Sequence, residues 1–401
     1  MKPFKLILCL LLIVIFGSCA SDDGNSSGMG YSDIYNLPEI PFNYSNPNFP
    51  DTFTPYVFGF DNTPFDNIIT DDGVTLGRVL FYDKKLSADN TISCASCHKQ
   101  EFGFSDNTPK SIGISGEHTF RNSMGFANAG FYAAENFSWD HKAPTLEAQV
   151  LLPITDEIEL GNTLEDLVEK LNDLAYYEPL FINAFGNKQI TSTKISKALS
   201  QFIRSIYSFN TKYDRGIEIT KDIFIDFPNF TAKENLGKDI FNGKLTPGAI
   251  GTCITCHLPN SAPLHFAQPI PENANQVIFS GAEPDNIGLD IDLNVEDNGL
   301  GGVLNIESFY GHFKTPSLRN IALTGPYMHD GRLETLEDVV EHYSTGVLAH
   351  PYLSAHMMNG EGEPRHLNLT AEESEALVAF MKTLTDYELI IDEKFSNPFV
   401  N

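Results

Sequence analysis

Residues 77–98 read GRVLFYDKKLSADNTISCASCH, and residues 237–257 read GKDIFNGKLTPGAIGTCITCH. Both stretches begin with glycine and a basic residue, reach a phenylalanine at the fifth position, and end in Cys-x-x-Cys-His. The first cysteine follows the glycine by 17 residues in one stretch and by 16 in the other. A duplicated segment of this kind predicts two domains built on one plan.

The Cys-x-x-Cys-His motifs indicate covalently attached c-type haem. In each motif two thiols three positions apart can form thioethers to the vinyl groups of one haem, and the adjacent histidine can bind the iron. The residues are Cys94, Cys97 and His98 in the first motif and Cys253, Cys256 and His257 in the second.

Two other chemistries use Cys-x-x-Cys pairs. Two pairs can form a four-sulfur zinc site, but here a histidine follows each pair and Cys94 and Cys253 lie 159 positions apart. A thioredoxin-like redox pair needs no histidine and would rarely occur twice. We therefore expect two covalently bound haems c.

The rest of the chain has the pattern of a mainly helical protein. Thr163 with Asp166, and Thr370 with Glu373, have the spacing of helix capping boxes. Strand-like alternation is sparse, so we expect a mainly α fold of two c-type cytochrome-like haem domains with long loops. Apolar residues recur at helical spacing in residues 164–174, 195–206 and 370–381.

The N-terminus is typical of an exported lipoprotein. Lys2 and Lys5 precede an apolar run over residues 6–16, and residues 16–19 read FGSC, which resembles a bacterial lipobox with Cys19 as the lipidated residue. Ordinary cleavage with a stray cysteine is the alternative. We expect a periplasmic protein or one anchored in the outer membrane, and surface display stays open.

Composition and the internal repeat divide the chain into four predicted segments. Residues 20–50 are rich in Ser, Gly, Asn, Asp and Pro, as in a tether. The predicted boundaries are 1–19 for the signal peptide and lipobox, 20–55 for the tether, 56–225 for an N-terminal haem domain and 226–390 for a C-terminal haem domain.

The charge balance limits the partners. With 26 basic and 53 acidic residues the formal net charge is −27. Such an acidic surface disfavours binding to nucleic acid and to anionic membranes, so we expect membrane contact only through the lipid anchor. A cationic redox protein would be steered toward the surface fastest, although the charge could equally serve solubility alone.

Residues 60–386 resemble the bacterial dihaem cytochrome c peroxidases and their relative MauG, which matures methylamine dehydrogenase. In that family the N-terminal haem reacts with peroxide and the C-terminal haem transfers electrons. The motifs that carry the resemblance are Leu86-Ser87, residues 137–149 around Trp139, FKTPSLRN at 313–320 and PYMHDG at 326–331.

The resemblance implies an open N-terminal iron. In the peroxidases a histidine after a Ser-Ile-Gly-like turn caps this haem, whereas here residues 111–114 read SIGI and place Ile114 at the ligand position. Isoleucine cannot bind iron. His118, four residues later, is a rival ligand or an ordinary loop histidine.

The resemblance also implies the catalytic residues. The family's Gln and Glu match Gln149 and Glu159, which lie 10 and 20 residues after Trp139. Glu159 would move a proton between the two peroxide oxygens, although a lone Glu in an acidic protein is more often solvated surface. Trp139 would carry electrons between the haems, or be a core aromatic.

At the second haem the family's distal ligand lies fourteen residues after His329, at Tyr343. Many of the peroxidases have Met at this position and MauG has Tyr, an anionic ligand that lowers the reduction potential. Met328, Met357 and Met358 are alternatives.

A calcium ion is a further implication of the resemblance. It would bind the Asn122 side chain and the carbonyl groups of Thr324 and Pro326.

Three functions follow from these expectations. The first is reduction of hydrogen peroxide to water with electrons from a small donor such as cytochrome c. The second is a MauG-like oxidase that uses peroxide to oxidise a protein or an organic substrate. The third is a non-enzymatic electron carrier. A homodimer stays open.

Overall fold

The structure is a computed structural model that describes residues 34–51, 55–132, 136–244, 253–257, 279–281, 283–293 and 296–400. Within these ranges the fold is mainly helical and extended segments meet only in isolated bridges, so the predicted fold class is confirmed. No helix in these ranges combines the length and the apolar character needed to cross a membrane. The predicted signal peptide and Cys19 lie outside the described residues.

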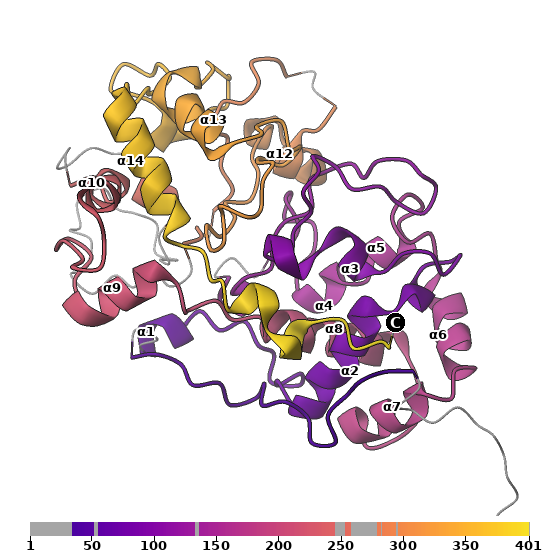
Figure 1. Ribbon diagram of the computed structural model, residues 1–401. Coiled ribbons are helices and arrows are strands. Elements are labelled where there is room, and N and C mark those ends of the chain that lie inside the picture. The colour runs from indigo at the N-terminus through magenta and orange to yellow at the C-terminus, as the bar shows by residue number, and fades with distance from the viewer. Residues whose placement is uncertain are drawn as a thin grey trace, which may run out of the picture.

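The helices follow one another along the chain as seen in Figure 1. The α-helices are α1 (Pro55–Phe58), α2 (Asp71–Tyr82), α3 (Cys94–Cys97), α4 (Leu146–Gln149), α5 (Leu152–Thr155), α6 (Leu164–Asn172), α7 (Tyr177–Phe185), α8 (Ser192–Arg204), α9 (Lys212–Thr220), α10 (Ala232–Phe241), α11 (Cys253–Cys256), α12 (Gly299–Leu304), α13 (Leu336–Glu341) and α14 (Ala371–Lys382). The single-turn 3₁₀ helices are η2 (Lys84–Leu86), η3 (Gln100–Phe102), η4 (Ala129–Phe131), η5 (Glu307–Phe309), η7 (Ala355–Met357), η8 (Leu389–Ile391) and η9 (Glu393–Phe395), and η6 (His342–Gly346) is a π-helix.

The three predicted helical segments correspond to α6, α8 and α14. The capping box of α14 forms as expected between Thr370 and Glu373. At α6 only half of the box forms: Thr163 Oγ1 accepts from the Asp166 N–H at 3.0 Å. The Thr163 N–H is instead bonded to Asn162 Oδ1 at 2.9 Å.

The duplicated sequence folds into a duplicated helix pair, α2 with α8 and α10 with α14. A glycine lies at each crossing. A Cβ at Gly77 would come within 2.0 Å of the Ala198 carbonyl oxygen, and a Cβ at Gly237 within 1.9 Å of the Ala376 carbonyl oxygen. The two helix pairs therefore cross at equivalent places and in equally close contact.

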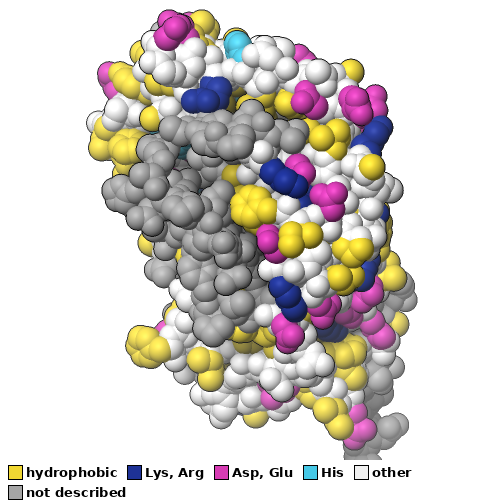
Figure 2. Space-filling view, turned by 90° about the vertical axis from the view of Figure 1, so that its left-hand side faces the viewer, with side chains coloured by type: hydrophobic (Ala, Val, Ile, Leu, Met, Phe, Trp, Pro, Cys, Tyr) yellow, Lys and Arg dark blue, Asp and Glu magenta, His cyan; other side chains and the backbone are white. Residues whose placement is uncertain are grey.

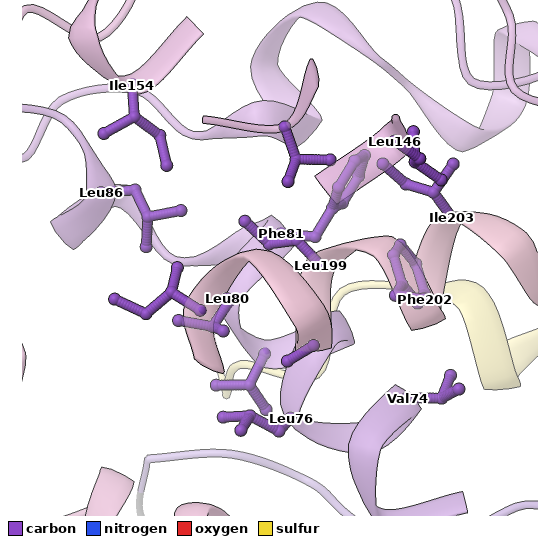
Figure 3. Packing of buried hydrophobic residues seen from close by; sticks show 14 of the residues in the cluster. Val74, Leu76, Leu80, Phe81, Leu86, Leu146, Ile154, Leu199, Phe202 and Ile203 are labelled. Carbon is purple, nitrogen blue, oxygen red and sulfur yellow. The ribbon is translucent and has the colours of Figure 1, made fainter. Parts of the chain in front are cut away.

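Apolar side chains fill the space around the first crossing (Figure 3). Phe81 of α2 meets Phe202 of α8 with ring centroids 5.0 Å apart, and Leu199 packs beside them. A second cluster lies between α9, α10, α13 and α14. Each half of the chain thus has its own core, and each core supports one haem-binding motif.

The two ends of the described chain meet on the N-terminal half. After α14 the chain runs back beside α8 and α2, which is the yellow segment in Figure 1. Arg78 Nε donates to the Ser396 carbonyl at 2.6 Å, and Phe399 forms a bridge with Tyr35. Tyr35 and Tyr44 fall within the predicted tether, yet both side chains are buried in the N-terminal core. This part of the segment belongs to the folded body.

Candidate functional site: two cavities joined at Trp139

The first motif lies in the wall of a cavity in the N-terminal half. Cys94, Cys97 and His98 form α3 and the residue that follows it, so one helical turn presents both thiols and the imidazole to the cavity. His98 Nδ1 lies 2.9 Å from the Phe104 carbonyl oxygen. This bond orients the ring and leaves Nε2 as the metal-binding atom. Burial lowers the pKa of His98 to about 4, which keeps the imidazole neutral, as a ligand must be.

The second motif is built in the same way in the C-terminal half. Cys253 and Cys256 are the ends of α11, and His257 Nδ1 lies 3.1 Å from the Phe279 carbonyl oxygen. All three line a second cavity. Since the two cysteine pairs face different cavities, they do not form one four-sulfur zinc site.

Gln149 and Glu159 line the same cavity as His98. Gln149 ends α4, and its Oε1 is buried without a hydrogen-bond partner among the described residues. Glu159 lies in the turn after α5, where Asp156 Oδ1 accepts from the N–H groups of Ile158 and Glu159 at 2.9 and 3.1 Å. The structure thus places the predicted pair in the lining of one cavity. The Gln149 oxygen there lacks the hydrogen-bond partner that a buried polar atom normally has.

The Glu159 carboxyl has an altered acidity. Burial raises its pKa to about 7, the nearby Asp156 carboxylate adds to the rise, and Lys142 opposes it. A carboxyl with a pKa near neutrality can both accept and release a proton at physiological pH.

Neither the rival ligand His118 nor Ile114, which occupies the family's ligand position, lines this cavity. His118 is exposed and its Nδ1 lies 3.0 Å from the Lys110 carbonyl oxygen. Ile114 packs against Gly161, and its N–H donates to the Ile158 carbonyl at 2.9 Å. Among the described residues that line the cavity, His98 is the one histidine.

The internal repeat gives a second reason why the N-terminal iron would be open. Residues 137–147 and 327–337 match position by position, so that Trp139 corresponds to His329. The residue fourteen positions after Trp139, where the C-terminal half has Tyr343, is Pro153. Pro153 lines the N-terminal cavity and carries no group that binds iron.

Trp139 lies between the two cavities and lines both. Its indole N–H donates to the Asn122 carbonyl at 2.9 Å, and its own carbonyl accepts from the Lys314 N–H at 2.7 Å. One bond therefore holds the indole ring and the other holds the backbone of the same residue.

Tyr343 lines the C-terminal cavity together with Met328 and Met357. It lies on the π-helix η6, and such turns are frequent at functional sites. Burial raises the pKa of Tyr343, and the neighbouring thiols of Cys256 and Cys253 act in the same direction. Met358 packs near Tyr343 but is not among the described residues that line the cavity.

The residues predicted to bind calcium also come together. Asn122, Thr324 and Pro326 all line the C-terminal cavity, close to Trp139. The Asn122 amide N–H donates to the Pro109 carbonyl at 3.1 Å, so its side-chain oxygen is the atom left to bind a cation. The calcium site stays a prediction.

Several neighbours of the site carry no recognisable sequence signal. Asp156 and Lys142 act on Glu159 from the same cavity wall. Near the second motif, Cys256, Asp285 and His356 place their ligand atoms within 4.8 Å of one another. Each of these groups is assembled by tertiary contacts between segments whose spacing in the sequence has no pattern.

The two cavities fit two haems c. Each offers two thiols outside any disulfide, one oriented imidazole and a largely apolar wall. The unpartnered Gln149 oxygen marks where a polar ligand of the N-terminal iron would be held. The Cys94 and Cys253 pairs would form the thioethers, and His98 and His257 would bind the irons.

Known proteins are similar to this chain. The model of the family described as di-haem cytochrome c peroxidase matches residues 71–222. A methylamine utilization protein MauG from Methylorubrum extorquens is 31% identical over 80% of this chain and 80% of its own length. A cytochrome c551 peroxidase from Nitrosomonas europaea is 28% identical over 78% of this chain and 80% of its own.

A solved structure is also similar to this chain. The crystal structure of a MauG-like protein associated with microbial copper homeostasis superposes with a TM-score of 0.71 and 32% identity, and covers 88% of this chain and 99% of its own. Together with the two oriented histidines and the paired cavities, these similarities show that the chain belongs to the dihaem cytochrome c peroxidase and MauG family, whose members carry two c-type haems.

Proposed function

We propose that the protein reduces hydrogen peroxide to water at the haem on His98, with electrons that a small redox protein supplies through the haem on His257. The observation that carries this proposal is that Glu159 and the unpartnered Gln149 oxygen line a cavity in which His98 is the one histidine among the described lining residues. The overall reaction consumes two electrons and two protons for each peroxide and yields two waters.

The protein's own residues supply the proton chemistry. When bound, the haem supplies the iron and the electrons that split the peroxide O–O bond. The ionised Glu159 carboxylate accepts the proton of the inner peroxide oxygen and returns it to the outer oxygen, which leaves as water. Gln149 Oε1 accepts a hydrogen bond from the peroxide and so holds it beside Glu159. Trp139, in contact with both cavities, carries electrons between them.

A MauG-like oxidase is the second candidate, and Tyr343 favours it. A phenolate ligand stabilises oxidised iron and lowers the reduction potential, so a haem with this ligand stores oxidising equivalents better than it accepts electrons. Two of the relatives are MauG proteins at 31% and 30% identity. Peroxide would react at the same N-terminal site, and the electrons would come from a protein or organic substrate.

Resting-state EPR of the purified holoprotein tests the open site that both candidates need. We expect one high-spin and one low-spin ferric signal, and the high-spin signal should convert to low spin when cyanide is added. Two low-spin signals that cyanide leaves unchanged would contradict both candidates and leave the electron carrier.

Steady-state kinetics separates the two candidates. With reduced cytochrome c and hydrogen peroxide, the peroxidase should turn over at about 1 s⁻¹ or faster. A MauG-like enzyme should oxidise cytochrome c slowly while its haems still respond to peroxide. A Tyr343→Met variant should raise the potential of the C-terminal haem and speed reduction by cytochrome c. Tyr327→Phe, in the same cavity, is the matched control and should leave that potential unchanged.

The proposed location is the periplasm or the outer membrane, with Cys19 lipidated. Support for it comes from the sequence of residues 1–19 alone. Metabolic labelling with a radioactive fatty acid should mark the wild-type protein and not a Cys19→Ala variant. Equal labelling of the two proteins would remove the anchor from the proposal.

A further inference from the structure

A tyrosine in the wall of the N-terminal cavity is paired with a histidine to which no role has been assigned. The Tyr132 hydroxyl and His141 Nε2 are 2.7 Å apart, and the two rings meet edge to face. Tyr132 is 3% exposed and lines the cavity that contains His98. It does not line the C-terminal cavity, so it differs from Trp139, which borders both.

The position of His141 shows that this pair is a departure from the repeat. The bridge Phe137–Ala143 in the first half corresponds to the bridge Tyr327–Leu333 in the second. Within these turns His141 corresponds to Gly331, and their φ angles are +57° and +70°. A left-handed φ costs glycine nothing, and histidine is among the other residues that adopt it more often than most.

The histidine at this position therefore marks a chemical difference between the two halves, since the corresponding residue of the second half is Gly331. What the histidine adds to this turn is an imidazole ring, and the ring's Nε2 is held against a buried phenol. Asp140, the preceding residue, is ion-paired with Arg121 at 2.6 Å and lies close enough to act on the imidazole charge.

Chemistry links the pair to an oxidised cofactor. A phenol that loses one electron also loses its proton, so a buried tyrosine is oxidised readily only where a base accepts that proton. Burial lowers the pKa of His141 to about 4, and the nearby Asp140 opposes the fall. The ring is thus neutral at physiological pH and its Nε2 can accept.

We propose that Tyr132 is a redox-active residue whose proton acceptor is His141. This inference rests on the proposed function, because the oxidant is the N-terminal cofactor after its reaction with peroxide. Tyr132 gives one electron to that cofactor, its O–H bond breaks, and the proton forms an N–H bond at His141 Nε2. An electron from an external one-electron donor later restores the phenol, and the proton returns from the imidazolium.

Lys314 contacts both Tyr132 and Trp139. Its side-chain nitrogen lies over the Tyr132 ring, and its backbone N–H is bonded to the Trp139 carbonyl. A positive charge over the ring would oppose oxidation, but burial lowers the pKa of Lys314 well below its usual range and favours the neutral amine. Tyr132 can thus store one oxidising equivalent on the N-terminal side, apart from the path through Trp139.

Rapid-freeze EPR of the holoprotein after one equivalent of hydrogen peroxide tests the inference. The wild-type protein should show an organic radical whose hyperfine pattern narrows when ring-deuterated tyrosine is incorporated. Tyr132→Phe should lose this signal. His141→Gly, which installs the residue found at Gly331, should slow radical formation about 100-fold, and added imidazole should restore part of the rate.

Tyr177→Phe is the matched control, since Tyr177 is a buried phenol bonded to Asp83 Oδ2 at 2.7 Å and lines neither cavity. It should leave the radical unchanged. Haem absorbance recorded on the same samples separates two failures. If the haems respond to peroxide and Tyr132→Phe keeps the wild-type radical, the inference is wrong and the proposed function stands. If peroxide leaves the haem spectra unchanged, both are wrong.

Discussion

At the scale of single residues, the acidity of Glu159 decides the pH at which the proposed reaction runs. Burial raises its pKa to about 7 because the ionised form loses hydration in the cavity wall. Only the ionised form can accept the peroxide proton, so the reaction should weaken as pH falls through this pKa.

The first prediction is a pH profile. The second-order rate of the haem absorbance change with hydrogen peroxide, measured by stopped flow from pH 5 to 9, should rise with pH and level off above a midpoint near 7. Glu159→Gln should lower the plateau by a factor of about 10² to 10⁴ and remove the midpoint. A variant that keeps the wild-type profile would show that another group moves the proton.

Two neighbours of Glu159 should move that midpoint in opposite directions. Asp156→Asn removes a negative charge while keeping the oxygen that accepts the Ile158 and Glu159 N–H groups, so the midpoint should fall. Lys142→Gln removes the opposing positive charge, so the midpoint should rise. Shifts of the same sign in both variants would contradict an electrostatic origin.

At the scale of elements, the close helix crossings are the points most sensitive to substitution. Gly77→Ala would drive a Cβ into the Ala198 carbonyl, and Gly237→Ala would do the same at Ala376. Neither backbone oxygen can move without shifting its helix, so each variant should lose about 2–3 kcal/mol of unfolding free energy. Urea unfolding followed by circular dichroism measures the loss.

Gly360→Ala is the control for this pair. No atom lies within 4 Å of the added Cβ, and its φ is outside the left-handed region. Its unfolding free energy should stay within about 0.5 kcal/mol of wild type. If all three variants lost the same unfolding free energy, the close contact at the helix crossings would not be the cause of the loss.

Helices α6 and α14 were predictable from the sequence because each carries a local signal, an apolar period and a Thr cap at Thr163 or Thr370. The π-helix at Tyr343, which begins directly after α13, had no such signal. The burial of Tyr44 within a composition typical of a tether was not predictable either. The Tyr44 hydroxyl bonds to the Lys394 carbonyl, 350 residues away.

Only part of the candidate site, likewise, was predictable from the sequence. The haem-binding residues follow from a spacing that chemistry fixes, whereas Gln149 and Glu159 follow from the family resemblance through their register with Trp139. Asp156 and Lys142, which act on Glu159, and the separate contact between Tyr132 and His141 could not be predicted, because they depend on distances that only the folded chain establishes.

At the scale of the whole molecule, Arg121 connects the two halves. Its guanidinium forms two bonds to Asp297, at 2.7 and 2.8 Å, and one ion pair with Asp140 at 2.6 Å. The three side chains are 6–16% exposed, so removing the cation leaves two enclosed carboxylates unpaired. Arg121→Gln should therefore cost about 3 kcal/mol of unfolding free energy.

Arg332→Gln is the comparison for this variant. Arg332 also bridges two aspartates, Asp290 and Asp330, but its side chain is 35% exposed. Solvent screens such pairs, so the loss should stay below about 1 kcal/mol. If the two variants lost the same unfolding free energy in urea, the enclosure of Arg121 would not strengthen its ion pairs.

The net charge of −27 also acts at this scale, through the field that an approaching donor meets. On the face shown in Figure 2, acidic side chains lie among lysines and arginines and do not form one large patch. The attraction that this face offers a cationic partner is then spread over it, and salt screens the attraction over a Debye length of about 8–10 Å.

The rate of reduction by a basic cytochrome should therefore fall about tenfold or more when salt is raised from 20 to 500 mM. With an acidic donor of similar potential the rate should rise over the same range, because screening then removes a repulsion. Stopped-flow mixing of each reduced donor with the ferric protein measures both rates. If neither rate depends on salt, the charge serves solubility and the donor docks through a neutral surface.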